Sequence, residues 1–309
     1  MSFIAFLVFV VVQIVFIPLA IIGIAVISYR QLAISKRLGV SATALSAMGQ
    51  RWIMHAYGIR KDPATIALYR ALPVGSEPAL WLLLFPSVVR HKLNPVVPEE
   101  GTETLTNAIM ARTTHIDRLI EKSKDTVEQF VIMGAGYDTR CYGDLKRHNL
   151  KFFELDQEKI QQLKRKSLAA AGIDASHVTF VTVDFATEHW YEKLEAAGFD
   201  PKKKTLFLWE GVTLYLSEAD VRKTIREIKE HAAPGSVLIA DFGSMRLIAL
   251  QGVKATKEKF AFGLDLSNEP EKVIRDFIES EHVTPGNVYS IGHKTPRGAV
   301  MAVAEMVMR

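Results

Sequence analysis

The sequence predicts an α/β fold in which a mostly parallel sheet ends in an antiparallel hairpin and is preceded by helices. Three observations lead to this prediction. From residue 130 to residue 282, short apolar runs alternate with amphipathic stretches of helical period. Four of these runs are followed at once by an acidic residue. The chain then finishes with two extended segments, 287–293 and 299–308, joined through Pro296 and Gly298, which favours a hairpin.

Composition narrows the class of protein. The 309 residues are 49% hydrophobic and 23% charged, which is typical of a folded protein. The net charge of +4 is small and the basic residues are mixed with acidic ones, so we expect no nucleic-acid partner. Cys141 is the single cysteine, which excludes a disulfide framework and a cysteine-rich metal site. No metal is expected.

The first long element is an apolar helix. Residues 3–27 carry no charge, and at 1.5 Å per residue they would cross a hydrocarbon layer of roughly 30 Å. A cleaved signal peptide would have a basic start and a shorter apolar core, whereas only Met1 and Ser2 precede this run. Because Arg30, Lys36 and Arg37 follow it, the positive-inside rule predicts a single-pass anchor over 1–30 with the catalytic domain cytoplasmic. A buried core helix is the alternative.

A helical region is expected over 31–125. Helical periodicity covers 40–71, with a new helix starting at Asp62-Pro63 because proline is tolerated in a first turn. The apolar patch at 78–89 is interrupted by Pro86, and it reads equally as core, as a lid over the active site or as a membrane-contact patch. A long helix is expected over 102–123, with Arg112 near its middle.

The first strand and the loop after it carry the strongest local signal. An apolar run at 130–133 stops at Gly134-Ala135-Gly136, where glycines let a ligand approach the backbone. A second strand, 151–155, leads into Asp156, twenty residues after Gly136, where a ribose-binding acid is found in nucleotide-binding units. We therefore expect an adenosine pocket, although a tight turn beside a solvated carboxylate would give the same pattern.

One residue argues against a dinucleotide. Thr139 stands where a GxGxxG loop would have its third glycine, the residue that lets a helix start close to a pyrophosphate. A ligand without phosphates fits this loop better.

The later segments continue the alternation. Helices are expected over 157–172, 189–197, 217–232 and 269–282, and strands over 178–183, 205–209 and 236–240. Asp184, Glu210 and Asp241 each follow directly on one of these strands, although Asp184 could instead cap a helix. Because ligands of parallel sheets bind at the carboxyl ends of the strands, we expect these acids to share one edge with Gly134 and Asp156.

In these segments the chain resembles the leucine carboxyl methyltransferase family of class I S-adenosylmethionine-dependent methyltransferases. The family's GAGxDTR loop is similar to residues 134–140, its ELD strand end to 154–156, and its EGxxxYL segment to 210–216. Asp184-Phe185 resembles another strand end of the family, and Arg51, Asp62-Pro63 and Arg112 resemble its leading helices. The resemblance covers about 40–309.

The resemblance implies a Rossmann-like, seven-stranded, mostly parallel sheet with a C-terminal antiparallel hairpin, in a methyltransferase domain over 126–309. It implies S-adenosyl-L-methionine as the cofactor. Gly134 and Gly136 would line its methionine portion, Asp156 would hold the ribose hydroxyls, and Asp184 with Phe185 would flank the adenine.

The same resemblance implies further cofactor contacts. Glu210 would lie near the amino group, while Arg112 and Arg51 would pair with the carboxylate through parallel hydrogen bonds. A surface salt bridge is the alternative for Arg112. The matching loop adds Ala135, Asp138 and Arg140 to the expected cofactor-binding residues.

The expected reaction is O-methyl transfer. A sulfonium methyl group is already activated, so catalysis depends mainly on holding the acceptor in line. A carboxylate acceptor needs no base, whereas a hydroxyl would use Glu210, Tyr215 or His115, of which Glu210 and Tyr215 are the catalytic candidates.

An apolar anchor is not usual in the soluble family, so we expect a hydrophobic, lipid-like or membrane-associated small molecule, or a carboxylate, as acceptor. Two alternatives stay open. The chain could be a catalytically silent, membrane-tethered cofactor-binding module, or an NAD(P)-dependent reductase. Thr139 and the terminal hairpin disfavour the reductase.

Overall fold

The computed structural model describes residues 3–38, 42–95, 98–185, 187–250 and 260–309. The chain forms two compact units. The first comprises Met1–Val97, Tyr137–Thr139 and Gln162–Asp174, and the second comprises Pro98–Gly136, Arg140–Gln161 and Ala175–Arg309.

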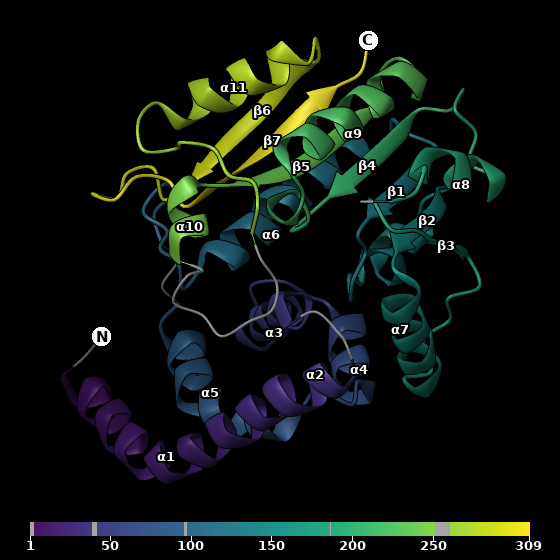
Figure 1. Ribbon diagram of the computed structural model, residues 1–309. Coiled ribbons are helices and arrows are strands. Elements are labelled where there is room, and N and C mark those ends of the chain that lie inside the picture. Colours follow the sequence, from purple (N-terminus) through teal and green to yellow (C-terminus); the bar gives the residue numbers. More distant parts are fainter. Residues whose placement is uncertain (1–2, 39–41, 96–97, 186, 251–259) are drawn as a thin grey trace. The chain divides into compact units, whose positions relative to one another are not determined.

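The second unit is built on one seven-stranded sheet with the order β3-β2-β1-β4-β5-β7-β6 (Figure 1). Its strands are β1 (Gln129–Met133), β2 (Lys151–Asp156), β3 (Val178–Thr182), β4 (Thr205–Trp209), β5 (Val237–Gly243), β6 (Thr284–Ile291) and β7 (Met301–Val307). The first five strands are parallel, and β7 runs antiparallel between β5 and β6. The mostly parallel sheet and its C-terminal hairpin are therefore confirmed.

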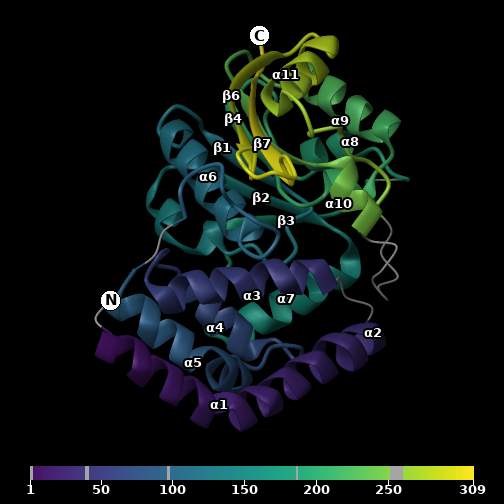
Figure 2. The same cartoon turned by 90° about the vertical axis from the view of Figure 1, so that its left-hand side faces the viewer.

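Helices cover both faces of this sheet, which explains why its central strands are apolar throughout. α6 (Ala108–Ser123) lies on one face, while α8 (Trp190–Ala196), α9 (Glu218–His231) and α11 (Pro270–Ser280) lie on the other (Figure 2). Along β1 the side chains alternate between two buried clusters. Phe130 and Ile132 pack with Ile116 of α6, whereas Val131 and Met133 belong to the cluster on the opposite face.

Several predicted boundaries in this unit are wrong, and two of them have a clear physical reason. β5 does not end before Asp241 but runs on to Gly243, because it pairs with β7 beyond the point where its parallel partner β4 stops. α6 begins at Ala108 and not at residue 102. The preceding segment makes other bonds, since Asn107 accepts from the backbone N–H of Thr104 at 2.7 Å and Glu103 accepts from that of Gly292 at 2.9 Å.

The first unit is helical. It contains α1 (Phe3–Tyr29), which continues through a π-helical turn η1 (Arg30–Ile34) into α2 (Ser35–Leu38), and then α3 (Ala42–Tyr57), α4 (Pro63–Ala71) and α5 (Glu77–Leu93). Asp62 caps α4 by accepting from the N–H of Thr65 at 2.9 Å, which confirms the predicted helix start. α7 (Glu158–Ala170) has residues in both units.

The sequence predicts that Pro86 interrupts the apolar patch at 78–89, and this is wrong. The whole patch lies inside α5, and Pro86 is buried there. The ring of Trp81 packs 5.2 Å from that of Trp52 in α3, and the ring of Phe85 stacks 5.2 Å from that of Phe16 in α1. The patch therefore joins helices of the first unit to one another. Phe85 nevertheless stays 41% exposed.

Candidate functional site

Four strand ends of the second unit come together at one edge of its sheet. In the parallel register Met133 pairs with Leu155 and Asp156 pairs with Thr182, so Gly134 lies level with Asp156, and Asp184 follows two residues beyond that level. Glu210 follows β4, the neighbour of β1 on its other side. The prediction that these residues share an edge is confirmed. Asp241 lies one residue beyond the last parallel pair of β5, within the strand.

The glycine loop is shaped by backbone conformation. Gly134 and Gly136 have φ angles of +71° and +46°, in the left-handed region that favours glycine. A Cβ atom on Gly134 would lie 2.4 Å from Cγ2 of Val212. The segment after β4 therefore packs directly on the loop after β1, which brings together two motifs almost eighty residues apart.

Asp156 lies against the same loop. Its Oδ2 atom accepts a hydrogen bond from the backbone N–H of Gly136 at 2.6 Å, and its Oδ1 atom accepts from that of Gln157 at 2.7 Å. The acid and the glycine loop, which are predicted to share one edge, are therefore in direct contact.

A buried network of ion pairs surrounds Glu210. Its Oε1 atom lies 3.1 Å from Nη2 of Arg112, and its Oε2 atom accepts from Nη1 of Arg140 at 2.6 Å. Arg112 also donates to Asp241 at 2.8 Å, and Nε of Arg140 donates to Asp117 at 2.7 Å. Arg112 is thus a buried residue and not a surface one. Three carboxylates against two guanidinium groups give the network a net charge of −1 when all are ionised.

The two inner members of this network affect each other's protonation. Burial works to lower the pKa of Arg112, but the charges of Asp241 and Glu210 outweigh it and raise that pKa, so the guanidinium stays cationic. Burial raises the pKa of Asp241, while the charge of Arg112 acts in the opposite direction. Among the described residues, none accepts a hydrogen bond from the buried Nε of Arg112.

Asp241 also fixes the turn that follows β4. Its Oδ1 atom accepts from the N–H of Gly211 at 2.7 Å, and its carbonyl oxygen accepts from the hydroxyl of Thr213 at 2.6 Å. Gly211 has a φ of +72° and faces the guanidinium of Arg112, whose Nη1 would be 3.4 Å from an added Cβ.

The sequence does not predict that Asp241 pairs with Arg112 or that Asp117 pairs with Arg140. The strand pattern predicts the correct edge for Asp241, but no spacing rule links this residue to one 129 positions earlier.

Asp138 and Thr139, which follow Gly136-Tyr137, both make polar contacts within the first unit. Within the first unit, Asp138 pairs with Arg51 at 3.0 Å, and both side chains are buried. The hydroxyl of Thr139 donates to Asp62 at 2.8 Å and lies 2.8 Å from that of Thr65. Thr139 thus replaces the third glycine of a dinucleotide loop with a bonded hydroxyl. That Arg51 and Asp138 contact a cofactor stays a prediction.

Asp184 and Phe185 follow β3 in a turn that does not cap α8. The carbonyl oxygen of Asp184 accepts from the N–H of Glu188 at 2.9 Å, and His189 occupies the N-cap position of α8 without a capping hydrogen bond from its side chain. The ring of Phe185 lies 6.1 Å from that of Trp190.

The candidate bases differ in their surroundings. Tyr215 ends the short helix η4 (Thr213–Tyr215), and its ring lies 5.4 Å from that of Phe260. His115 stacks at 3.4 Å on the ring of Tyr289 in β6. Burial, followed by the charge of Arg118, lowers the pKa of His115, so its imidazole is neutral at pH 7.

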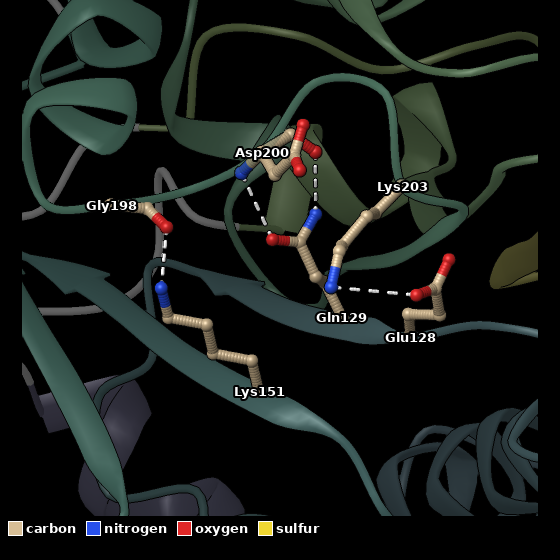
Figure 3. Close-up of a pocket in the computed structure, with 6 residues that line it drawn as sticks. All are labelled: Glu128, Gln129, Lys151, Gly198, Asp200 and Lys203. Carbon is tan, nitrogen blue, oxygen red and sulfur yellow. Dashed lines mark hydrogen bonds and ion pairs between the residues drawn. The ribbon is translucent and has the colours of Figure 1, made fainter.

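A small cavity of about 200 Å³ lies at the opposite edge of the sheet, where β1 and β2 begin (Figure 3). The residues that line it bond to one another. Gln129 donates to the carbonyl of Asp200 at 2.8 Å, Lys151 donates to that of Gly198, and Lys203 pairs with Glu128. These bonds join the strand starts to the loop before β4, and this edge carries none of the predicted site residues.

The sequence profile of the leucine carboxyl methyltransferase family matches residues 57–229, which is more than half of the chain. A Bacillus subtilis (strain 168) protein, provisionally named S-adenosyl-L-methionine-dependent methyltransferase YktD, is 30% identical over 177 residues, or 56% of this chain and 58% of that protein. A Mycobacterium avium (strain 104) protein with the same provisional description is 30% identical over 207 residues, 65% of this chain and 63% of its own length. The chain thus aligns with about three fifths of these relatives.

Among solved structures, magnesium protoporphyrin IX methyltransferase (ChlM) from Synechocystis PCC 6803 with bound SAH aligns with 68% of this chain and 90% of its own, at 13% identity and a TM-score of 0.44.

Proposed function

Since this chain belongs to the leucine carboxyl methyltransferase family, we propose that it is an S-adenosyl-L-methionine-dependent methyltransferase that binds its cofactor at the carboxyl edge of the sheet. One observation carries the proposal. In the second unit the glycine loop contacts both the acid that ends β2 and the Glu210-Gly211-Val212 segment, through Gly136 with Asp156 and through Gly134 with Val212.

The residues at this edge suit a cationic nucleoside without phosphates. Asp156 and Glu210 would repel a pyrophosphate, whereas the surplus carboxylate of the ion-pair network favours a positive ligand. The buried Nε of Arg112 is a donor without a partner among the described residues, and a carboxylate on the ligand would satisfy it. When bound, the cofactor supplies a methyl group activated by its positive sulfur.

The residues would then act as follows. Gly134, Ala135 and Gly136 offer backbone without steric obstruction, and Asp156 accepts hydrogen bonds from ribose hydroxyls. Asp184 and Phe185 flank the adenine of the cofactor.

The ion-pair network supplies the remaining contacts in this proposal. Glu210 lies near the amino group, and its two arginines keep its orientation fixed. Arg112 receives the carboxylate. Because each oxygen of Glu210 lies in an ion pair with a buried guanidinium group, we assign Glu210 to positioning. Where a hydroxyl is methylated, we assign the role of general base to Tyr215.

The acceptor that we propose is a hydrophobic or membrane-associated small molecule, or a carboxylate, methylated on oxygen. The apolar helix α1 supports this choice, because its uncharged stretch is long enough to cross a membrane and few of its side chains are buried. The proposal includes attachment of the protein to a membrane through α1, with the catalytic domain on the cytoplasmic side.

The test is calorimetric titration with S-adenosylmethionine, followed by assay of S-adenosylhomocysteine formation with a lipid extract. Asp156→Asn should weaken cofactor binding about tenfold or more, since it removes a charged acceptor. Glu128→Gln, at the opposite edge of the sheet, is the matched control and should bind normally.

Two other results of these experiments would each support a different function. Binding without product formation would support the silent module, and binding of NAD in place of S-adenosylmethionine would support a reductase.

A further inference from the structure

The apolar helix α1 does not stand apart from the first unit. It runs antiparallel to α5 and packs beside it (Figure 2). Contacts occur at three levels, which join Phe9 to Arg90, Phe16 to Phe85, and Gly23 to Ala79. Beyond the last level, Arg30 donates to the carbonyl oxygen of Pro73 at 3.2 Å, just before α5 begins. The contact therefore extends from Phe9 to the end of α1.

The closest approach of the two helices is at Gly23. This glycine is buried, and a Cβ atom there would lie 2.6 Å from the carbonyl oxygen of Ala79 and 3.2 Å from the backbone nitrogen of Leu83. Small residues at a helix crossing allow two backbones to come this close. The seam between α1 and α5 is thus backbone against backbone, which an anchor attached only by its end would not show.

The outer face of α1 is aliphatic and exposed. Among the side chains of α1 that the structure describes, nine large apolar ones are more than 36% exposed: Leu7, Val11, Ile14, Val15, Ile17, Leu19, Ile21, Ile22 and Ile24. α5 continues this surface through Phe85, Val89 and Leu93, which recur every four residues and are 41%, 39% and 81% exposed. An exposed apolar surface of this extent marks a contact with a membrane or a partner.

Polar residues on the other side of α5 argue against a crossing α1. There α5 packs on α3, where the ring of Tyr57 lies 4.8 Å from that of His91, next to the Arg90 that covers Phe9. If α1 crossed a bilayer, Arg90, whose guanidinium lies over the ring of Phe9, would enter the hydrocarbon beside it together with the neighbouring His91, at a high free-energy cost.

Charge identifies the partner as a lipid surface. The first 61 residues contain six basic residues, Arg30, Lys36, Arg37, Arg51, Arg60 and Lys61, and no acidic residue. Lys36 and Arg37 are exposed just after α1, and Arg90 and Lys92 are exposed at the opposite end of the α1–α5 pair. An apolar face with cations at both ends matches the core and the anionic headgroups of one leaflet.

We infer that α1 lies in the plane of the membrane, with its outer face and the Phe85, Val89 and Leu93 stripe in one anionic leaflet, and does not cross the bilayer. This inference rests on the proposed attachment to a membrane and is independent of the proposed chemistry. It differs from the single-pass anchor that the sequence predicts.

The topology can be tested with an epitope tag fused before Met1 of the full chain. After expression in a bacterial host, protease is added to spheroplasts and to inverted membrane vesicles. A helix in the plane of the inner leaflet leaves the tag on the cytoplasmic side, so it should be digested in inverted vesicles and protected in spheroplasts. Digestion in spheroplasts would overturn the inference, because the N-terminus would then have crossed.

The choice of partner is tested by sedimentation with vesicles of phosphatidylcholine alone or with 30% phosphatidylglycerol. The double variant K36Q/R37Q should lose about tenfold or more in affinity for the anionic vesicles. The matched control K202Q/K203Q, which removes two exposed cations of the second unit, should bind as the parent does.

Equal binding to both vesicle types, or a dimer that ignores vesicles because a second copy covers α1, would overturn the inference. Titration with S-adenosylmethionine on the same samples keeps the two proposals apart. A parent protein that binds the cofactor normally but does not bind anionic vesicles would count against the membrane inference alone. A parent protein that binds the vesicles but not the cofactor would count against the enzyme function alone.

Discussion

Glu210 shows how single residues prepare the candidate site, because buried guanidinium groups hold both of its oxygens. Removing two opposite charges from water has a large desolvation cost, so such pairs are weak contributors to net stability. Their benefit is a fixed orientation before a ligand arrives. Asp241 and Asp117 extend this effect, since each holds the outer side of one arginine.

The two outer acids should differ sharply when neutralised. Asp241→Asn leaves buried Arg112 with one fewer partner, and we expect it to lower the free energy of unfolding by about 3 kcal/mol. Asp117→Asn removes a carboxylate that is 31% exposed, so we expect about 1 kcal/mol or less. Urea unfolding at pH 7 measures the free energy of unfolding of both variants. Equal decreases would show that the energetic contribution of each ion pair does not depend on its burial.

Gly134 should be irreplaceable for two separable reasons. Gly134→Ala forces a left-handed φ on alanine, at about 1–2 kcal/mol, and also creates the clash with Val212. Gly172→Ala is the control, because Gly172 has a φ of +68° but no atom within 4 Å of an added Cβ. We expect the Gly134 variant to lose more stability in urea.

The double variant G134A/V212A should recover the difference between these two, as a double-mutant cycle would measure. Similar losses for Gly134→Ala and Gly172→Ala would mean that the Val212 contact relaxes freely.

The sequence could predict contacts that follow from strand order but not contacts between distant side chains. Gly136 lies in the loop after β1 and Asp156 ends the adjacent parallel strand β2, so strand order alone predicted that they share one edge. Arg112 lies on a helix and Asp241 on β5, and their pairing depends on how α6 lies on the sheet. Helical periodicity gives the buried face of α6 but not its rotation over the sheet to within one side chain.

Local sequence signals predict where most helices and strands begin and end, except where packing against another element changes the boundary. Asp62-Pro63 and Ser217 predicted helix starts correctly, because a side-chain oxygen there meets an N–H of the first turn. β5 extends beyond its predicted end because its residues pair with the neighbouring strand β7 up to Gly243. Pro86 does not end α5, because α5 contacts α1 and α3 both before Pro86, through Trp81 and Phe85, and after it, through Arg90 and His91.

The cap of α4 should make stability depend on pH. Burial raises the pKa of Asp62, but the charge of Arg60 and hydrogen bonds from Thr65 and Thr139 outweigh it and leave that pKa below its ordinary value. The unfolded chain therefore binds the proton more tightly. The stabilisation is fully present above the unfolded pKa of about 4 and is lost as the pH falls through the lower folded value.

Asp62→Asn should accordingly lower the free energy of unfolding by about 1–2 kcal/mol at pH 7, and by less at pH 3. Ser217→Ala removes the cap of α9, which does not titrate, so its effect should be the same at both pH values. Urea titrations at the two pH values give the comparison. An Asp62→Asn effect that does not shrink in acid would contradict the assigned low pKa.

Charge is distributed unevenly over the whole molecule. The first 61 residues carry six basic and no acidic side chains, whereas the remaining 248 residues carry 32 basic and 34 acidic ones. The small net charge of the chain therefore hides a cationic end joined to a slightly anionic body. Such an asymmetry orients a protein toward an anionic surface before any apolar contact forms.

Vesicle affinity should thus have two components. Raising the salt concentration from 0.05 to 0.5 M shortens the Debye length to roughly 4 Å and should weaken binding to anionic vesicles about tenfold. A residual affinity should persist at high salt, because burial of the aliphatic face of α1 is not screened. Complete release at 0.5 M salt would show that the helix does not enter the lipid.

Cys141 follows the glycine loop directly, and its side chain is fully buried. Its sulfur can react with a bulky aromatic disulfide reagent only when this part of the protein opens, so the colour released on reaction reports the frequency of that opening. The native chain contains no other thiol and needs no engineered probe. A nucleoside bound to the loop would lower the rate of this reaction in proportion to its occupancy. The reaction rate of Cys141 can therefore be used to screen ligands.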